Sequence, residues 1–209
     1  MKRRDFVKGA ATVIPAGVAL NMLNMKWAFA QDADFGDDVD VLNYALTLEY
    51  LESEFYRQGN SAGLLEGQES EFLEQVGADE DAHVDGITQT IMDLGGTPVE
   101  APGVDFADAF DSREKFLTTA HTFENLGVQA YLGAAGFIQS KAILSAAASI
   151  FGVEARHAAV IGNLLNLSAE GGVYMGATEI PLSKSEVLEA ASPFITDAAG
   201  MGEGAAVTY

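Results

Sequence analysis

Two copies of one short pattern hold the residues of this chain that are best suited to chemistry. Each copy has a glutamate, then a second glutamate 31 residues later in one copy and 30 in the other, and a histidine three residues after that. Four glutamates and two histidines at this spacing can form the ligand set of a dinuclear metal site between packed helices. The sequence therefore predicts a site for two divalent ions. Its six ligands are Glu49, Glu80 and His83 in the first copy and Glu124, Glu154 and His157 in the second.

Helical geometry and charge explain why these residue types suit a metal centre. Positions i and i+3 of a helix project from one face, so each Glu-x-x-His pair can reach one ion. The two upstream glutamates fall on mostly apolar helix faces, where an isolated carboxylate would be too costly to bury. Four carboxylates need four positive charges, which two divalent ions supply. Oxygen-rich ligation with one imidazole per ion suits iron or manganese and leaves room for zinc.

The repeat also assigns positions within the centre. We expect Glu80 and Glu154 to bridge the two ions, and Glu49 and Glu124 to cap their outer sides. Glu52 competes with Glu49 for the first ligand position because it flanks the same sector of the helix. Glu49 is favoured because it preserves the spacing of the second copy.

A single Glu-x-x-His pair is usually an ordinary solvated helix face. The matched repetition, with an upstream glutamate in each copy, is what favours metal binding here. His121 precedes Glu124 by three residues and could face the site. A packing or surface role is the stronger interpretation for this histidine.

Three further residues are candidates for supporting roles. Tyr56 and Tyr131 each follow an outer glutamate by seven residues, which places them on the same helix face. They could donate hydrogen bonds to ligand carboxylates or electrons to the metals, or they could be ordinary core tyrosines. Metal-bound histidines need a partner on the far ring nitrogen, and Asp79 could serve His157. The second copy has Val153 at that position, so we expect two inequivalent metals.

Apolar residues recur at helical spacing along most of the chain, and strand-like alternation is scarce. We therefore predict an all-α fold with a four-helix bundle over residues 38–168. The connection 95–111 is long enough to run the length of a bundle, whereas the turns within each pair of helices are short. One long crossover between two hairpins resembles the ferritin-like arrangement. The predicted helices span 38–58, 67–94, 112–139 and 141–167.

Residues 169–209 form a predicted C-terminal extension. We predict that residues 183–195 form one short helix, which caps an end of the bundle. The Gly/Ala-rich stretch 197–209 is expected to be mobile and is assigned no function.

Residues 1–30 have the pattern of an export signal. A basic start precedes an apolar run over 10–23 and a small-x-small sequence at 28–30. The pair Arg3-Arg4 resembles a twin-arginine signal. We therefore expect a periplasmic or extracellular protein that is free of the membrane after cleavage. A retained membrane anchor is the alternative, but the run is shorter than the ~20 residues that a span needs.

Charge and cysteine content exclude several classes of partner. The leader holds five of the 11 basic residues and one of the 31 acidic ones, so the remainder has a formal charge near −24. Such a surface repels nucleic acid and anionic lipid, and we exclude both. The chain has no cysteine, so disulfides, iron–sulfur clusters and thiolate zinc sites are excluded too.

The six predicted ligands match the pattern of the ferritin-like superfamily, including bacterioferritins and rubrerythrins. The segment 42–56, Leu-Asn-Tyr-Ala-Leu-Thr-Leu-Glu-Tyr-Leu-Glu-Ser-Glu-Phe-Tyr, more closely resembles the branch of desiccation-related proteins. The resemblance spans residues 41–167. It implies an iron or manganese protein that reacts with dioxygen or peroxide in oxidative or desiccation stress. The alternative is a non-enzymatic protective or interaction protein with a structural metal site. A homodimer is a further expectation.

Overall fold

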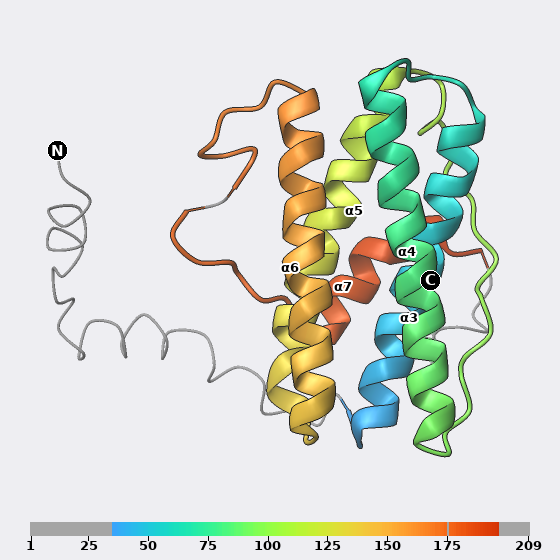
Figure 1. Ribbon diagram of the computed structural model, residues 1–209, viewed down its shortest axis with the longest axis vertical. Coiled ribbons are helices and arrows are strands. Elements are labelled where there is room, and N and C mark those ends of the chain that lie inside the picture. The colour runs from blue at the N-terminus through green and yellow to red at the C-terminus, as the bar shows by residue number, and fades with distance from the viewer. Residues whose placement is uncertain (1–34, 175, 197–209) are drawn as a thin grey trace, which may run out of the picture. The chain divides into compact units, whose positions relative to one another are not determined.

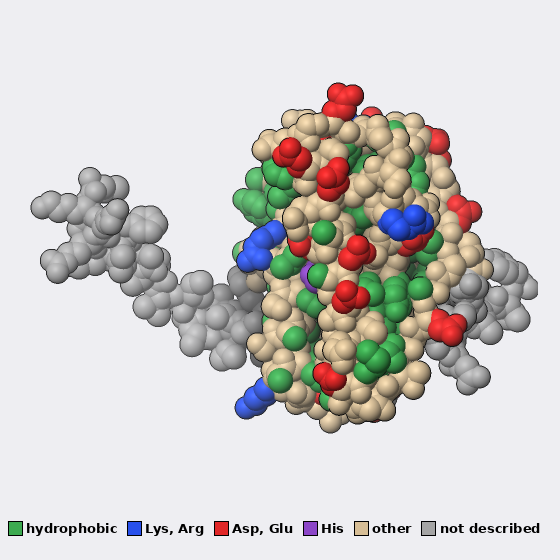
Figure 2. Space-filling model, turned by 45° about the vertical axis from the view of Figure 1, so that its right-hand side comes forward, with side chains coloured by type: hydrophobic (Ala, Val, Ile, Leu, Met, Phe, Trp, Pro, Cys, Tyr) green, Lys and Arg blue, Asp and Glu red, His purple; other side chains and the backbone are tan. Residues whose placement is uncertain are grey.

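The computed structural model of this chain describes residues 35–174 and 176–196. The predicted export signal over 1–30 and the predicted mobile stretch over 197–209 lie outside the described residues. On the face drawn in Figure 2, acidic side chains are scattered over the surface with few basic ones between them, which fits the net charge of −20.

Four long helices form the described part of the chain, as predicted (Figure 1). The first pair packs together as one hairpin and the second pair as another. Between residues 35 and 196 the backbone shows only two isolated β-bridges and no strand, so the all-α prediction is confirmed. The helices are α3 (Asp38–Ser61), α4 (Gln68–Asp93), α5 (Arg113–Ala134) and α6 (Lys141–Leu164).

Side-chain caps fix where three of these helices begin. The Asp37 carboxylate accepts hydrogen bonds from two backbone N–H groups of the first turn of α3. Ser112 caps α5 as the sequence predicts, and Ser140 caps α6 in the same way. These bonds satisfy N–H groups that have no partner inside the helix.

Helix α5 ends five residues earlier than predicted. It stops at Ala134 and continues as a short 3-10 turn, η2 (Ala135–Phe137). The backbone N–H groups of Gln139 and Ser140 then donate to the Asp38 carboxylate at the start of α3, at 2.7 and 2.9 Å. This distant carboxylate holds the turn that redirects the chain into α6.

The connection 95–112 runs the length of the bundle, from the end of α4 to the start of α5 (Figure 1). At its beginning, the N–H of Val99 donates to the Asn43 side chain at 2.8 Å. Towards its end, Phe106 and Ala109 are buried in the main core. The predicted crossover between two hairpins is therefore present.

An aromatic cluster fills the core on the α3–α5 side of the bundle. Phe55 is fully buried at its centre. Its ring centroid lies 5.0 to 5.4 Å from those of Tyr56, Phe106, Phe110, Phe116 and Phe123.

The C-terminal segment packs along the side of α5 rather than capping an end of the bundle. It forms α7 (Lys184–Ala191) and the 3-10 turn η3 (Ser192–Phe194). At one end, the N–H of Leu182 donates to the Gln129 carbonyl of α5. At the other, the Phe194 ring lies 4.8 Å from that of Phe123. The predicted position was wrong because the apolar residues of α7 complete the core beside α5.

Helix α6 is long and apolar enough to cross a membrane by length and composition alone. It packs mainly against α5, and its buried residues include Glu154 and His157. Because α6 turns a carboxylate and an imidazole into the protein interior, it belongs to the bundle.

Phe55→Ala should lower the free energy of unfolding by about 3–5 kcal/mol, because it empties the centre of the aromatic cluster. Urea denaturation measures the change. Phe72→Ala is the matched control, since Phe72 is 38% exposed and should change stability by no more than about 0.5 kcal/mol. Equal losses in the two variants would show that the cluster does not hold the core together.

Candidate metal centre

All six predicted ligands meet in the interior of the bundle. Each of the four long helices contributes to the set, because the Glu-x-x-His pairs lie on α4 and α6 and the outer glutamates on α3 and α5. The four glutamates are at most 1% exposed, and the side chain of His157 is 7% exposed. The side chain of His83 is slightly more open, at 11%.

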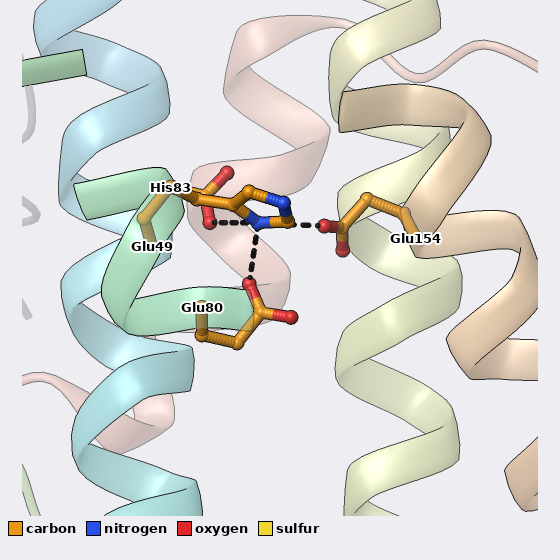
Figure 3. A group of neighbouring side chains, drawn as sticks. All are labelled: Glu49, Glu80, His83 and Glu154. Carbon is orange, nitrogen blue, oxygen red and sulfur yellow. Dashed lines mark hydrogen bonds and ion pairs between the residues drawn. The ribbon is translucent and has the colours of Figure 1, made fainter. Parts of the chain in front are cut away.

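His83 is surrounded by carboxylates from three helices (Figure 3). Its Nδ1 atom lies 3.2 Å from Oε2 of Glu49 and 2.9 Å from Oε2 of Glu80. The same nitrogen lies 3.3 Å from Oε1 of Glu154. One ring nitrogen therefore faces three carboxylates at once.

His157 occupies the matching position in the second half. Its Nδ1 atom lies 3.0 Å from Oε1 of Glu80 and 3.2 Å from Oε2 of Glu124. Its Nε2 atom lies 3.1 Å from Oδ2 of Asp79, the partner that the sequence suggested. Among the described residues, Nε2 of His83 has no such partner. The two histidines thus differ on the side of the ring that faces away from the carboxylates.

The side chains form two groups that could each hold a metal ion. One ligand atom from every member of a group lies within 4.8 Å of the others. Glu80 and Glu154 belong to both groups, which is the placement that the sequence predicted for bridging carboxylates. The first group is Glu49, Glu80, His83 and Glu154, and the second is Glu80, Glu124, Glu154 and His157.

Unpaired oxygens at the centre fit a metal ion. Both carboxylate oxygens of Glu154 and Oε1 of Glu80 are buried without a hydrogen bond. The Glu80 oxygen is close to Nδ1 of His157 but outside hydrogen-bond geometry. A buried acceptor without a partner costs about 1–3 kcal/mol, and more when it is charged. A cation between the two shared carboxylates would give these oxygens a partner.

The two tyrosines tie the halves of the centre together. The Tyr56 hydroxyl donates to Oε1 of Glu124, and the Tyr131 hydroxyl donates to Oε1 of Glu49. Each phenol thus bonds the outer glutamate of the other hairpin. Burial raises the pKa of both phenols well above its usual range, and the nearby carboxylates raise it further, so both stay protonated donors.

Without metal, protons on the histidines supply positive charge to the centre. Burial alone would lower the pKa of each imidazole, but hydrogen bonds with the surrounding carboxylates outweigh it. They raise the pKa of His83 to about 12 and that of His157 to about 11. Burial would likewise raise the pKa of Glu80, yet its hydrogen bonds with the two histidines lower it to about 2. For Glu49, burial prevails and raises the pKa to about 7.

Glu52 is a fifth buried carboxyl group at this centre. From the sequence, Glu52 was an alternative to Glu49 for the first ligand position. In the structure both glutamates are buried, and only Glu49 belongs to a potential metal group. Burial, followed by repulsion from Glu154, raises the pKa of Glu52 well above its usual range. This environment therefore favours the protonated form of Glu52.

Gly127 leaves the space that the Glu154 carboxylate occupies, with Glu52 in contact beside it. It follows Glu124 by three residues, as Glu52 follows Glu49. A Cβ atom on Gly127 would lie 2.7 Å from Oε2 of Glu154 and 3.5 Å from Oε1 of Glu52. In the sequence, the pairing of Glu52 in one copy of the repeat with Gly127 in the other was the sign that the two halves differ at this position.

His121 lies outside both potential metal groups. Its Nε2 atom is 3.3 Å from the side-chain nitrogen of Asn125, one turn along α5. A Cβ on Gly162 of α6 would lie 3.0 Å from the same atom, so the ring packs between these two helices. Burial lowers its pKa.

Comparison with known proteins agrees with this architecture. Residues 37–167 match the family described as ferritin-like domain. Among curated proteins, no match to the chain is found. A hypothetical protein from Methanococcus jannaschii is 16% identical over 76% of this chain and 94% of its own, with a TM-score of 0.53, and shows the same fold. The bacterioferritin-related protein of Bacteroides fragilis, described as a dodecameric thioferritin, is 25% identical over 61% of this chain and 83% of its own, with a TM-score of 0.48.

Divalent metal should stabilise the protein through the two shared carboxylates. Mn²⁺ at about 100 times its Kd should add about 2.7 kcal/mol to the free energy of unfolding. Glu80→Gln combined with Glu154→Gln should abolish this gain, because each substitution removes a charge from both groups. Thermal unfolding with and without Mn²⁺ measures the effect. Glu71→Gln, at an exposed position of α4, is the control and should retain the gain. Full stabilisation of the double variant would place the metal elsewhere.

Metal binding should release protons and become tighter as the pH rises. At pH 7 the raised pKa values leave His83 and His157 protonated, and a metal must displace these protons. The apparent affinity should increase about tenfold per pH unit for each proton released. Calorimetry in two buffers with different ionisation enthalpies counts these protons. A proton count of zero would contradict the prediction.

The stability of the metal-free protein should fall as the pH rises, whereas its metal affinity should increase. A folded pKa above the unfolded value of about 6.5 stabilises the fold fully below that pH. This contribution should be lost as the pH rises towards 11 to 12, the range of the two folded pKa values.

Proposed function

Because the chain belongs to the ferritin-like family, we propose that its buried carboxylate–histidine cluster holds two iron ions and reacts with dioxygen or peroxide. The observation that supports this proposal best is the overlap of the two potential metal groups. They share Glu80 and Glu154, and three oxygens of these shared carboxylates lack a hydrogen bond.

The donor set favours iron, with manganese as the other ion that suits it. Four carboxylates carry four negative charges, which two divalent ions neutralise. Oxygen-rich ligation with one imidazole per ion suits both metals. A bound iron pair would supply the electrons that reduce dioxygen or peroxide, while the protein supplies position and charge.

The residues around the ligands hold them in place. Asp79 accepts a hydrogen bond from Nε2–H of His157, which leaves Nδ1 directed at the carboxylates. Tyr56 and Tyr131 orient the two outer glutamates, and each phenol lies one hydrogen bond from the centre, where it can also donate an electron. Burial and the charge of Glu154 raise the pKa of Glu52, which favours a proton on this carboxyl group in the metal-free protein.

We also propose that the protein acts outside the cytoplasm, in protection against oxidative or desiccation stress. Support comes from the export-signal pattern of residues 1–30 and from the resemblance of segment 42–56 to desiccation-related proteins. A twin-arginine signal exports folded proteins, which suits a metal centre loaded before export.

A structural role for the metals is the second candidate. The near-complete burial of the ligands favours it, because ions that join four helices would stabilise the fold without any reaction. The two candidates differ in one respect, which is the consumption of oxidant.

The iron-loaded protein should consume dioxygen or hydrogen peroxide. After anaerobic loading with Fe²⁺, admission of either oxidant should oxidise two iron ions per chain, faster than the same iron oxidises in buffer. The Glu80→Gln, Glu154→Gln double variant should fall to the buffer rate, and Glu71→Gln should match the original protein. Stopped-flow absorbance and an oxygen electrode follow the reaction. Bound iron that oxidises no faster than in buffer would leave only the structural role.

A further inference from the structure

An apolar pocket of about 270 Å³ adjoins one side of the metal centre. All four long helices line it, and His83 and Tyr131 are the two residues of the centre that reach it. The exposed lining residues lie only on α4 and α6, at Ala82, Gly86, Ala146 and Ser149. The pocket therefore opens to solvent between α4 and α6 and leads inward to the His83 side of the centre.

Apart from His83 and Tyr131 at its inner end, the lining offers almost nothing to a polar ligand. No Asp, Glu, Lys or Arg is among the described residues that line the pocket, although the chain carries a net charge of −20. The hydroxyl of Thr90 donates to the Gly86 carbonyl at 2.7 Å, and that of Ser149 to the Ala146 carbonyl at 2.6 Å. These two hydroxyls are thus already bonded within their own helices. Along this part of the pocket, away from His83, a charged ligand would lose its hydration without compensation.

The size and shape of the pocket point to an elongated molecule. A cavity of ~150 Å³ is enough to hold benzene, so this volume far exceeds the needs of dioxygen. Along α4 the lining extends from Ala82 to Thr90, which corresponds to about 12 Å of helix. Along α6 it extends from Ile143 to Ile150, or about 10 Å. The lining thus extends for about two turns along each of these helices.

We propose that this pocket binds an apolar organic molecule with an unbranched alkyl chain and holds one end of it beside His83 and Tyr131. His157 does not line this pocket, and its Nε2 atom is bonded to Asp79. A ligand in the pocket therefore approaches the centre from the His83 side. Its role as a substrate rests on the proposed function, whereas its binding does not require metal.

A series of 1-alkanols from butanol to decanol tests the proposal on the metal-free protein. Each added methylene should tighten the Kd three- to fourfold until the pocket is full. Calorimetry measures the affinities. An affinity that does not depend on chain length would overturn the proposal.

Two glycines provide a matched pair of variants. A Cβ on Gly86 meets no atom within 4 Å, so Gly86→Leu can place a side chain at the mouth of the pocket without a clash. It should weaken the binding of octanol at least tenfold. Gly152 of α6 has equally open surroundings but does not line the pocket, so Gly152→Leu should bind octanol normally. Ala147→Phe, which fills the pocket from α6, should also weaken binding at least tenfold. Unchanged affinity in both Gly86→Leu and Ala147→Phe would overturn the proposal.

Histidine ring signals in NMR spectra report where the ligand lies. Octanol should shift the ring signals of His83 and leave those of His157 and His121 in place, with His121→Asn and His157→Gln used for assignment. Shifts confined to other histidines would overturn the placement beside His83. Because this readout needs no metal, it separates the two proposals. Alkanol binding without iron oxidation would refute the proposed function alone, and iron oxidation without alkanol binding would refute the pocket alone.

Discussion

The concentration of negative charge in a dry interior is the constraint on which this structure depends. Five carboxyl groups, contributed by all four long helices, are buried within one bundle. Such groups are tolerated inside a protein only with protons or cations close to them. Protons on the two histidines fulfil this role in the absence of metal, and burial favours the protonated form of Glu52. Every long helix carries part of the charge, so the packing of the bundle and the neutralisation of its centre cannot be separated.

The internal repeat produces a centre that is symmetric in its ligands and asymmetric around them. Each tyrosine bonds the outer glutamate of the opposite hairpin, which joins two hairpins that otherwise pack mainly within themselves. The symmetry fails in two places. Glu52 in one half corresponds to Gly127 in the other, and the apolar pocket is lined by His83 but not by His157. The repeat therefore accounts for the two potential metal groups, whereas the departures from it decide how the two sides of the centre differ.

The sequence predicted what depends on spacing along one helix and missed what depends on contacts between distant segments. The six ligand positions follow from helical periodicity, and Ser112 was recognisable as a cap because its bond is local. The end of α5 depends on Asp38, a residue about one hundred positions away. The packing of α7 along α5 and the burial of Glu52 against Gly127 likewise need the assembled bundle. For the tyrosines the sequence left two interpretations open, and only the structure shows which carboxylate each one bonds.

The sharing of Glu80 and Glu154 between both groups means that neither half of the centre is an independent compartment. An ion held by either group would engage both shared carboxylates, so it would change the charge and the ligand set left for the other group. Loading of the two halves would therefore be coupled.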